Sequence, residues 1–111
     1  MELISEEKNG VLVVCVKGDI DLNSNVEFKK FVNEKIDNGC NELIIDFSGI
    51  EYIDSSGLGT LLTAKKKVSK NQGDIVLFGL SDTIKTLFKM SKLLGFFNVF
   101  ENMDDALSSF Q

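Results

Sequence analysis

Three short and almost wholly apolar runs constrain the fold of this chain more than any other feature of its sequence. They are Val11–Val16, Leu43–Phe47 and Ile75–Phe78. Runs of this length suit β-strands, and the near absence of polar alternation predicts strands that are covered on both faces of a sheet. A longer segment with apolar residues at helical spacing follows each run. Strands that alternate with helices in this way predict parallel strand pairs joined by crossover connections.

Capping signals predict where the helices begin and end. Ser24 and Glu27 match a capping box, in which each side chain satisfies a free amide at a helix start, and Gly39 is expected to end that helix. A second helix is expected to begin near Ser55 or Ser56. The apolar residues expected to face the core are Phe28, Phe31, Val32 and Ile36 in the first helix, and Leu58, Leu61, Leu62 and Val68 in the second. We expect Lys65, Lys66, Lys67 and Lys70 to lie on the solvated face of the second helix.

The two ends of the sequence add shorter elements. Residues 1–6 predict an edge strand, which Asn9-Gly10 joins to the first apolar run through a hairpin turn. Residues 97–100 predict a last short strand. The phenylalanines are expected in the core, although Phe96 and Phe97 could be partly exposed. Two further helices are expected, one from Ser81-Asp82 with Ile84, Leu87 and Phe88 inside, and one capped by Asn102 and Asp105 with Met103, Leu107 and Phe110 inside. The sequence therefore predicts one α/β domain over residues 1–111, with a mixed, mostly parallel sheet of four to five strands and about four helices.

Composition argues against several classes of function. The chain has 17 acidic residues and 12 basic ones, a net charge of -5 and no arginine. Nucleic-acid binding is not expected, because it depends on basic side chains that neutralise phosphates. The longest apolar run is too short to span a bilayer, and residues 1–10 lack the apolar centre of a signal peptide. We therefore expect a cytoplasmic protein that does not insert into membranes.

The same composition argues against catalysis. The chain has no histidine, so it lacks the usual base for a serine or cysteine nucleophile and any imidazole metal ligand. Cys15, in an apolar run, is expected in the core, and Cys40 is expected to be an inert loop thiol. We expect no catalytic residue, no metal and no cofactor. Asp19, Asp21 and Glu51 form either a solvated acidic rim or, with Asp54, a surface that selects a basic partner.

The segment Asp54-Ser55-Ser56-Gly57-Leu58-Gly59 carries most of the functional information. It joins the carboxyl end of an expected strand to a helix start, which is where open α/β sheets place binding sites. It is not a dinucleotide fingerprint, because Leu62 stands in place of the third glycine, and it lacks the ending of a phosphate-binding loop. Asp54 or Ser55 could simply cap the helix. The two glycines could allow tight packing against the sheet or the close approach of another backbone.

In this setting the motif resembles the signature of the STAS domain, in its anti-sigma factor antagonist branch. The resemblance extends over three segments: Gly18–Ser24 (GDIDLNS), Leu43–Leu62 (LIIDFSGIEYIDSSGLGTLL) and Leu80–Leu93 (LSDTIKTLFKMSKL). Lys92 departs from the family pattern, in which glycine is common, so the length of the third helix or a contact near it is expected to differ.

The resemblance implies a phosphorylation switch at Ser55. Its partner would be an anti-sigma factor that is also a serine kinase, and a metal-dependent serine phosphatase would reverse the modification. The unphosphorylated form would bind that partner and free a sigma factor, thereby regulating transcription. The implied partner-binding residues are Asp21, Asp54, Ser55, Ser56, Gly57, Leu58 and Gly59. We expect a monomer.

Three alternatives stand beside this hypothesis. Ser56 is a competing phosphorylation site, although it suits a polar residue at a helix start. The chain could instead be a stand-alone STAS subunit of a transporter, a lipid-transport complex or a stress-signalling assembly. A hydrolase using Ser55 is the third alternative, and the absent histidine opposes it. A phosphate at a helix N-terminus faces free amides and the positive end of the helix dipole, so we expect phosphorylation to act by charge and bulk and to leave the backbone nearly unchanged.

Overall fold

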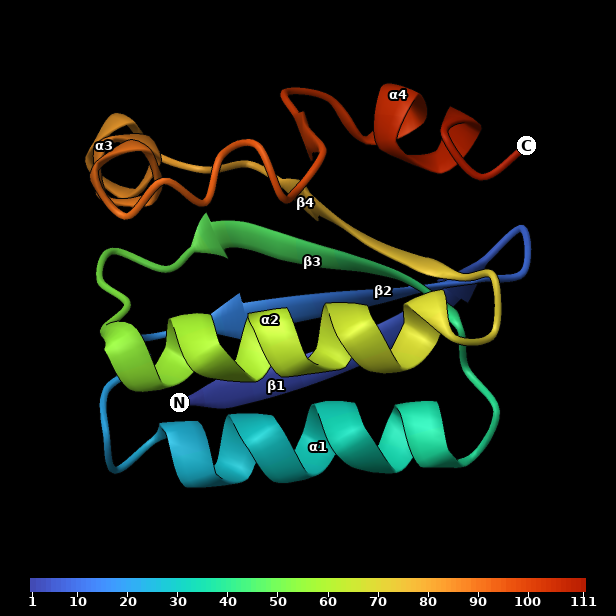
Figure 1. Cartoon of the computed structure of the whole chain (residues 1–111), viewed down its shortest axis with the longest axis horizontal. Helices are drawn as coiled ribbons and strands as arrows, with labels where there is room; N and C mark the ends of the chain where they lie inside the picture. The colour runs from blue at the N-terminus through green and yellow to red at the C-terminus, as the bar shows by residue number, and fades with distance from the viewer.

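The computed structural model describes all 111 residues and contains one five-stranded sheet with four helices (Figure 1). The strands are β1 (Glu2–Lys8), β2 (Val11–Lys17), β3 (Glu42–Gly49), β4 (Asp74–Phe78) and β5 (Val99–Phe100). The helices are α1 (Asn25–Asp37), α2 (Ser55–Ser69), α3 (Asp82–Met90) and α4 (Met103–Ser108). Strand order follows the sequence from β1 to β5, with β1 antiparallel to β2 and every other neighbouring pair parallel. The predicted fold class is confirmed.

The larger core lies between the sheet and the helices α1, α2 and α3. Figure 1 shows α1 and α2 side by side across one face of the sheet. Phe28 of α1, Phe47 of β3 and Phe88 of α3 are all fully buried there. The Phe88 ring lies edge-to-face against Phe47 at 6.0 Å and against Phe97 at 6.1 Å between centroids. These contacts fix α3 and the segment after it against the sheet.

A smaller core lies on the opposite face, under α4. Ala106 of α4 contacts a cluster formed by Val11, Val13, Ile44 and Val76. Successive residues of a strand point to opposite faces, so β2, β3 and β4 contribute apolar side chains to both cores. The prediction of strands covered on both faces is confirmed.

The predicted turn at the hairpin is also confirmed. Asn9 and Gly10 have φ angles of 54° and 82°, the left-handed pair that a two-residue hairpin turn requires. At the other end of the chain, β5 is shorter than expected. It begins at Val99, because Phe97 turns into the larger core and packs against Phe88. Phe96, by contrast, is exposed.

Two expectations about individual side chains need correction. Lys65 and Lys67 do not lie on a purely solvated face, because they form ion pairs with Asp74 and Asp37. Cys15 is only half-buried, in the smaller core, where its thiol lies 3.4 Å from the Asp46 carboxylate. No helix combines the length and the apolar character that a membrane span requires.

Candidate partner-binding site

The site is built from two loops that follow the parallel strands β2 and β3. Ile20 and Ile53 form an isolated parallel bridge between these loops. The Ile20 amide donates to the Tyr52 carbonyl at 2.9 Å, and the Asp54 amide donates to the Ile20 carbonyl at 3.0 Å. Both isoleucine side chains are fully buried. The loop that carries Asp21 is therefore held beside the start of α2.

Asp54 is the N-cap of α2. Its backbone is extended, and its Oδ1 accepts from the amides of Ser56 at 2.9 Å and Gly57 at 3.3 Å. The same oxygen accepts from the Ser56 hydroxyl at 2.5 Å. One carboxylate thus satisfies two helix-start amides that would otherwise lack a partner.

The cap separates the roles of the two serines in the motif. Ser56 is half-buried and its hydroxyl is committed to Asp54. Ser55 is the exposed first residue of α2, and no hydrogen bond within the protein engages its hydroxyl. Of the two predicted phosphorylation sites, Ser55 is therefore the one whose oxygen is open to another protein.

The loop before α1 is organised by Asp21, and here the predicted capping box is wrong. Asp21 Oδ1 accepts from the amides of Asn23 at 3.0 Å and Ser24 at 2.9 Å. The Ser24 hydroxyl donates to the Asp19 carbonyl at 2.8 Å and accepts from the Asp21 amide at 2.9 Å. These loop contacts occupy the Ser24 side chain, so it caps no α1 amide.

Both carboxylates carry negative charge at neutral pH. The side-chain hydrogen bond from Ser56, with the amides of Gly57 and Ser56, lowers the pKa of Asp54. The backbone hydrogen bond from Ser24 is the main cause that lowers the pKa of Asp21. Asp19 and Glu51 are exposed nearby in the same two loops. The region around Ser55 is accordingly acidic.

The two glycines of the motif have different roles. A Cβ on Gly57 would lie 2.7 Å from side-chain atoms of both Ile20 and Ile53, so Gly57 lets α2 sit against the bridge. A Cβ on Gly59 would meet nothing within 4 Å, and Gly59 is exposed. The fold thus explains Gly57 but not Gly59. Leu58 is buried in the larger core, and the burial of Gly57 and Leu58 argues against direct partner contact at these two predicted positions.

Three exposed apolar side chains in the same loops and helix start were missing from the sequence-based prediction. Leu22 is 71% exposed, Val26 70% and Tyr52 52%. An isolated apolar residue inside an acidic loop, as at Leu22, was the available signal. Large apolar side chains that remain in solvent beside polar residues are typical of protein-binding surfaces.

A shallow hollow of about 340 Å³ lies between α1 and α2 at this end of the molecule. Ser55, Ser56 and Gly59 line it from α2, and Lys29 from α1 is its one charged lining residue. The Thr60 hydroxyl donates to Asn25 Oδ1 at 2.9 Å and links the two helices beneath it. The hollow is open and polar, which suits contact with another protein better than enclosure of a substrate.

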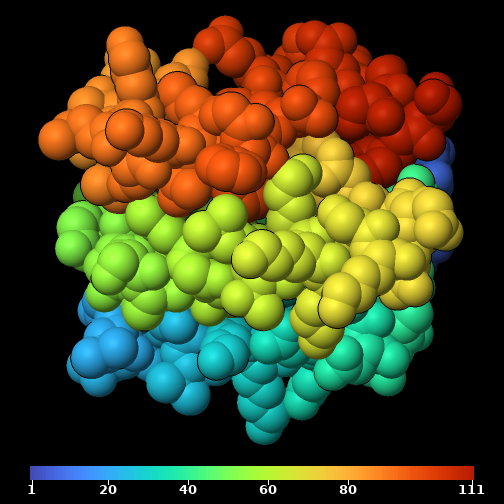
Figure 2. Space-filling model, viewed as in Figure 1, coloured from blue at the N-terminus to red at the C-terminus, as the bar shows by residue number.

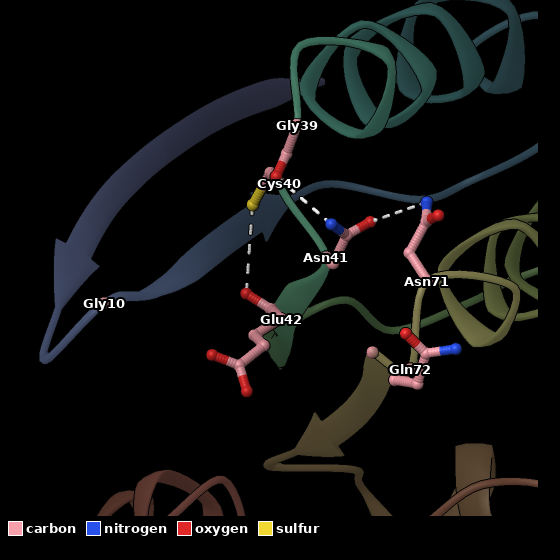
Figure 3. A pocket seen from close by; sticks show the side chains of 8 residues that line it. Gly10, Gly39, Cys40, Asn41, Glu42, Asn71 and Gln72 are labelled. Carbon is pink, nitrogen blue, oxygen red and sulfur yellow. Dashed lines mark hydrogen bonds between the residues drawn. The ribbon is translucent and has the colours of Figure 1, made fainter.

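A second polar hollow, shown in Figure 3, lies where β3 and β4 begin and α1 and α2 end. It is far from Ser55, because parallel strands begin and end at opposite edges of a sheet. Its polar groups largely satisfy one another: the Asn41 side chain donates to the Gly39 carbonyl and accepts from Asn71. Burial raises the pKa of the Cys40 thiol, so this thiol stays protonated at neutral pH, in agreement with an inert role. No group of three or more potential metal ligands occurs in the chain.

Comparisons with known proteins match the whole domain. The family model described as STAS domain matches residues 2–106. The putative anti-sigma factor antagonist BtrV of Bordetella bronchiseptica is 25% identical over 111 residues, which cover all of this chain and 96% of that protein. The anti-sigma-B factor antagonist of Listeria monocytogenes is 33% identical over 91 residues, covering 81% of this chain and 79% of the relative. The crystal structure of a putative anti-sigma factor antagonist from Thermotoga maritima superposes with a TM-score of 0.92 at 18% identity, covering 96% of this chain and 92% of that one.

The contrast between the glycines generates a stability prediction. Gly57→Ala should lower the free energy of unfolding by about 1–3 kcal/mol, because the new methyl group must displace two buried isoleucines. Gly59→Ala should raise it by about 0.5–1 kcal/mol, since alanine favours an open helical position more than glycine does. Urea unfolding of the two variants and the unchanged protein measures both effects. Equal destabilisation by the two substitutions would contradict the conclusion that packing requires glycine at position 57 but not at position 59.

The cap at Asp54 generates a pH prediction. Folding lowers the pKa of this carboxyl, so its contribution to stability is fully present above the ordinary aspartate pKa of about 3.9 and is lost as the pH falls through the lowered folded value. Asp54→Asn keeps a capping oxygen but removes the titration. The difference in free energy of unfolding between the unchanged protein and Asp54→Asn should stay constant from pH 7 to about pH 5 and change only near and below pH 4. An NMR titration of the Asp54 carboxyl carbon with a midpoint at or above the ordinary value would overturn this explanation.

Proposed function

Because the chain belongs to the STAS domain family, we propose that it is an anti-sigma factor antagonist whose binding is switched off by phosphorylation of Ser55. In the unphosphorylated state it binds an anti-sigma factor and thereby frees a sigma factor for transcription. That partner is also the serine kinase that modifies Ser55, and a metal-dependent serine phosphatase restores the binding form. The observation that carries the proposal is the exposed, unengaged hydroxyl of Ser55, which directly follows the ionised N-cap carboxylate of Asp54.

The names of the relatives support an anti-sigma factor as the partner. The Listeria relative is named for antagonism of an anti-sigma factor, and the Bordetella relative carries a corresponding name. The match to the Bordetella relative covers the whole chain, and so includes the loops that hold Asp21 and Asp54 together. In this proposal the domain itself performs no catalysis, and the chemistry at Ser55 belongs to its partners.

The geometry suggests how the unphosphorylated surface binds. Leu22, Val26 and Tyr52 would lose their solvent exposure against the partner and act as apolar anchors. The carboxylates of Asp21 and Asp54 would select a basic partner face and speed the encounter. Gly59, which the fold itself does not require, would let the partner's backbone approach α2 closely.

Phosphorylation would act on this interface without refolding the domain. The expectation that a phosphate would face free amides here is wrong for Ser56 and Gly57, because Asp54 already accepts from both amides. The phosphate would therefore add charge to a surface that is already acidic. Affinity falls only through what the partner brings against this position: one like charge of the partner at about 5 Å from the phosphate, with an effective dielectric constant of about 20, costs roughly 3 kcal/mol, and the bulk of the phosphate adds to this. This corresponds to a loss of affinity on the order of a hundredfold. The start of α2 would keep its position, because Gly57 is packed on the Ile20–Ile53 bridge.

The switch can be tested with a purified anti-sigma kinase and ATP. Mass spectrometry should locate one phosphate on Ser55; Ser55→Ala should remain unmodified, and Ser56→Ala should still be phosphorylated. In titration calorimetry the phosphorylated protein should bind the kinase about a hundredfold more weakly than the unmodified protein. Ser55→Asp should weaken binding less, because it adds one charge and little bulk. Phosphate on another residue, or unchanged affinity after modification, would overturn the proposal.

Gly59 provides a separate test of the contact surface. Gly59→Ala should weaken binding to the same partner at least tenfold, although it makes the domain itself more stable. Glu7→Ala, an exposed change on β1 at the opposite end of the sheet, is the control and should leave affinity unchanged. Undiminished affinity of the Gly59 variant would remove this residue from the proposed interface.

A further inference from the structure

A second surface, distinct from the Ser55 end, lies between α2 and the segment that follows α3. Here a groove of about 620 Å³ is lined by Ser69 and by six larger side chains, those of Leu62, Lys65, Lys66, Lys70, Leu93 and Phe96. In Figure 2 the boundary between α2, across the middle, and the later segment, above it in orange, faces the viewer. With a rise of 1.5 Å per residue, Leu62 lies about 10 Å along α2 from Ser55, so the groove begins beyond the proposed switch.

Phe96 is the feature of this groove that the fold does not explain. Its side chain is 60% exposed, whereas its neighbour Phe97 is buried against Phe88. The Phe96 amide donates to the Leu93 carbonyl at 2.9 Å, and Leu93 is itself buried. A backbone turn anchored on both sides therefore holds an aromatic ring in solvent beside an apolar groove. Such a preorganised aromatic side chain is typical of binding hot spots.

The charges on the rim of the groove are all positive. Lys65 is paired with Asp74, but Lys66 and Lys70 are exposed and take part in none of the three ion pairs of the protein. Lysines in the last turn of α2 also complement the helix dipole, which accounts for their place in the sequence. The helix dipole does not account for the apolar groove beside these lysines. In a chain with a net charge of -5, this basic and apolar surface favours an acidic partner.

We propose that this groove binds an amphipathic helix of a second protein, with an apolar stripe flanked by carboxylates. The groove follows α2 from Leu62 to Lys70, about 12 Å or two helical turns, which matches anchors at positions i, i+3 or i+4, and i+7. It is formed by a helix and a loop and offers no unpaired strand edge, so recognition falls to side chains. The surface does not depend on the proposed switch and remains available whether or not Ser55 is modified.

The test uses three fluorescein-labelled synthetic peptides of 16 residues: an amphipathic sequence with leucine and phenylalanine anchors flanked by glutamate, its scrambled form, and a version with lysine in place of glutamate. Fluorescence anisotropy should show saturable binding of the acidic amphipathic peptide alone. Phe96→Ala should weaken it at least tenfold, as should the double substitution Lys66→Glu and Lys70→Glu. The matched control Lys30→Glu, on α1, should leave it unchanged. Phe96 is exposed, so its variant should fold, which circular dichroism checks.

Each other outcome contradicts the proposal. Equal binding of the scrambled or basic peptide would show unspecific association, and undiminished binding to Phe96→Ala would place the contact elsewhere. Sedimentation of a dimer that Phe96→Ala dissociates would assign the groove to a second copy of this chain. Binding of dodecanoate without binding of the peptide would assign the groove to a small amphiphilic anion.

The groove can be tested independently of the switch at Ser55. Ser55→Asp should leave peptide affinity within about twofold, so a failure of the groove proposal can be told apart from a failure of the proposed switch.

Discussion

The backbone bridge between Ile20 and Ile53 is the contact on which the organisation of the site depends. It ties together the loops that leave two neighbouring parallel strands, and both side chains are buried beneath the first turn of α2. Gly57 is needed because these side chains occupy the space of a Cβ. This contact sets the direction in which α2 begins and brings the loop of Asp21 beside Asp54. It also leaves Ser55 exposed, because Ser55 lies between the N-cap Asp54 and the buried Gly57.

Much of the fold could be predicted from the sequence because apolar runs and the turn residues that flank them indicated the same elements. The run Val11–Val16 indicated a strand covered on both faces, and Asn9-Gly10 and Gly39 marked its turn and the end of the next helix. The Ser24–Glu27 pattern misled, because a serine that matches a capping box can equally bond within the preceding loop. Here Asp21 and Asp19 are the local competitors that engage it. Such competition depends on loop geometry that residue spacing does not encode.

The site was predictable in its location but not in its composition. Placing Ser55 at a helix start after a parallel strand required only the strand–loop–helix pattern. Distinguishing Gly57 from Gly59 required the positions of Ile20 and Ile53, which are more than thirty residues apart in sequence. The exposure of Leu22, Val26 and Tyr52, and the pairing of Lys65 with Asp74, likewise arise from tertiary placement. A helical pattern predicts which face a residue takes, but not whether a neighbour of opposite charge will reach it.

The cap formed by Asp54 also bears on how long a chemical mark at the next residue could persist. A helix start with vacant amides would bind a phosphoryl group through those amides and hold it close to the fold. In this domain the carboxylate of Asp54 already holds the amides of Ser56 and Gly57. A phosphoryl group on Ser55 would therefore stay exposed and accessible to a phosphatase, while hydrolysis by water alone would be negligibly slow. The lifetime of the phosphorylated state would be set by the kinase and the phosphatase, because the domain itself would do little to prolong it.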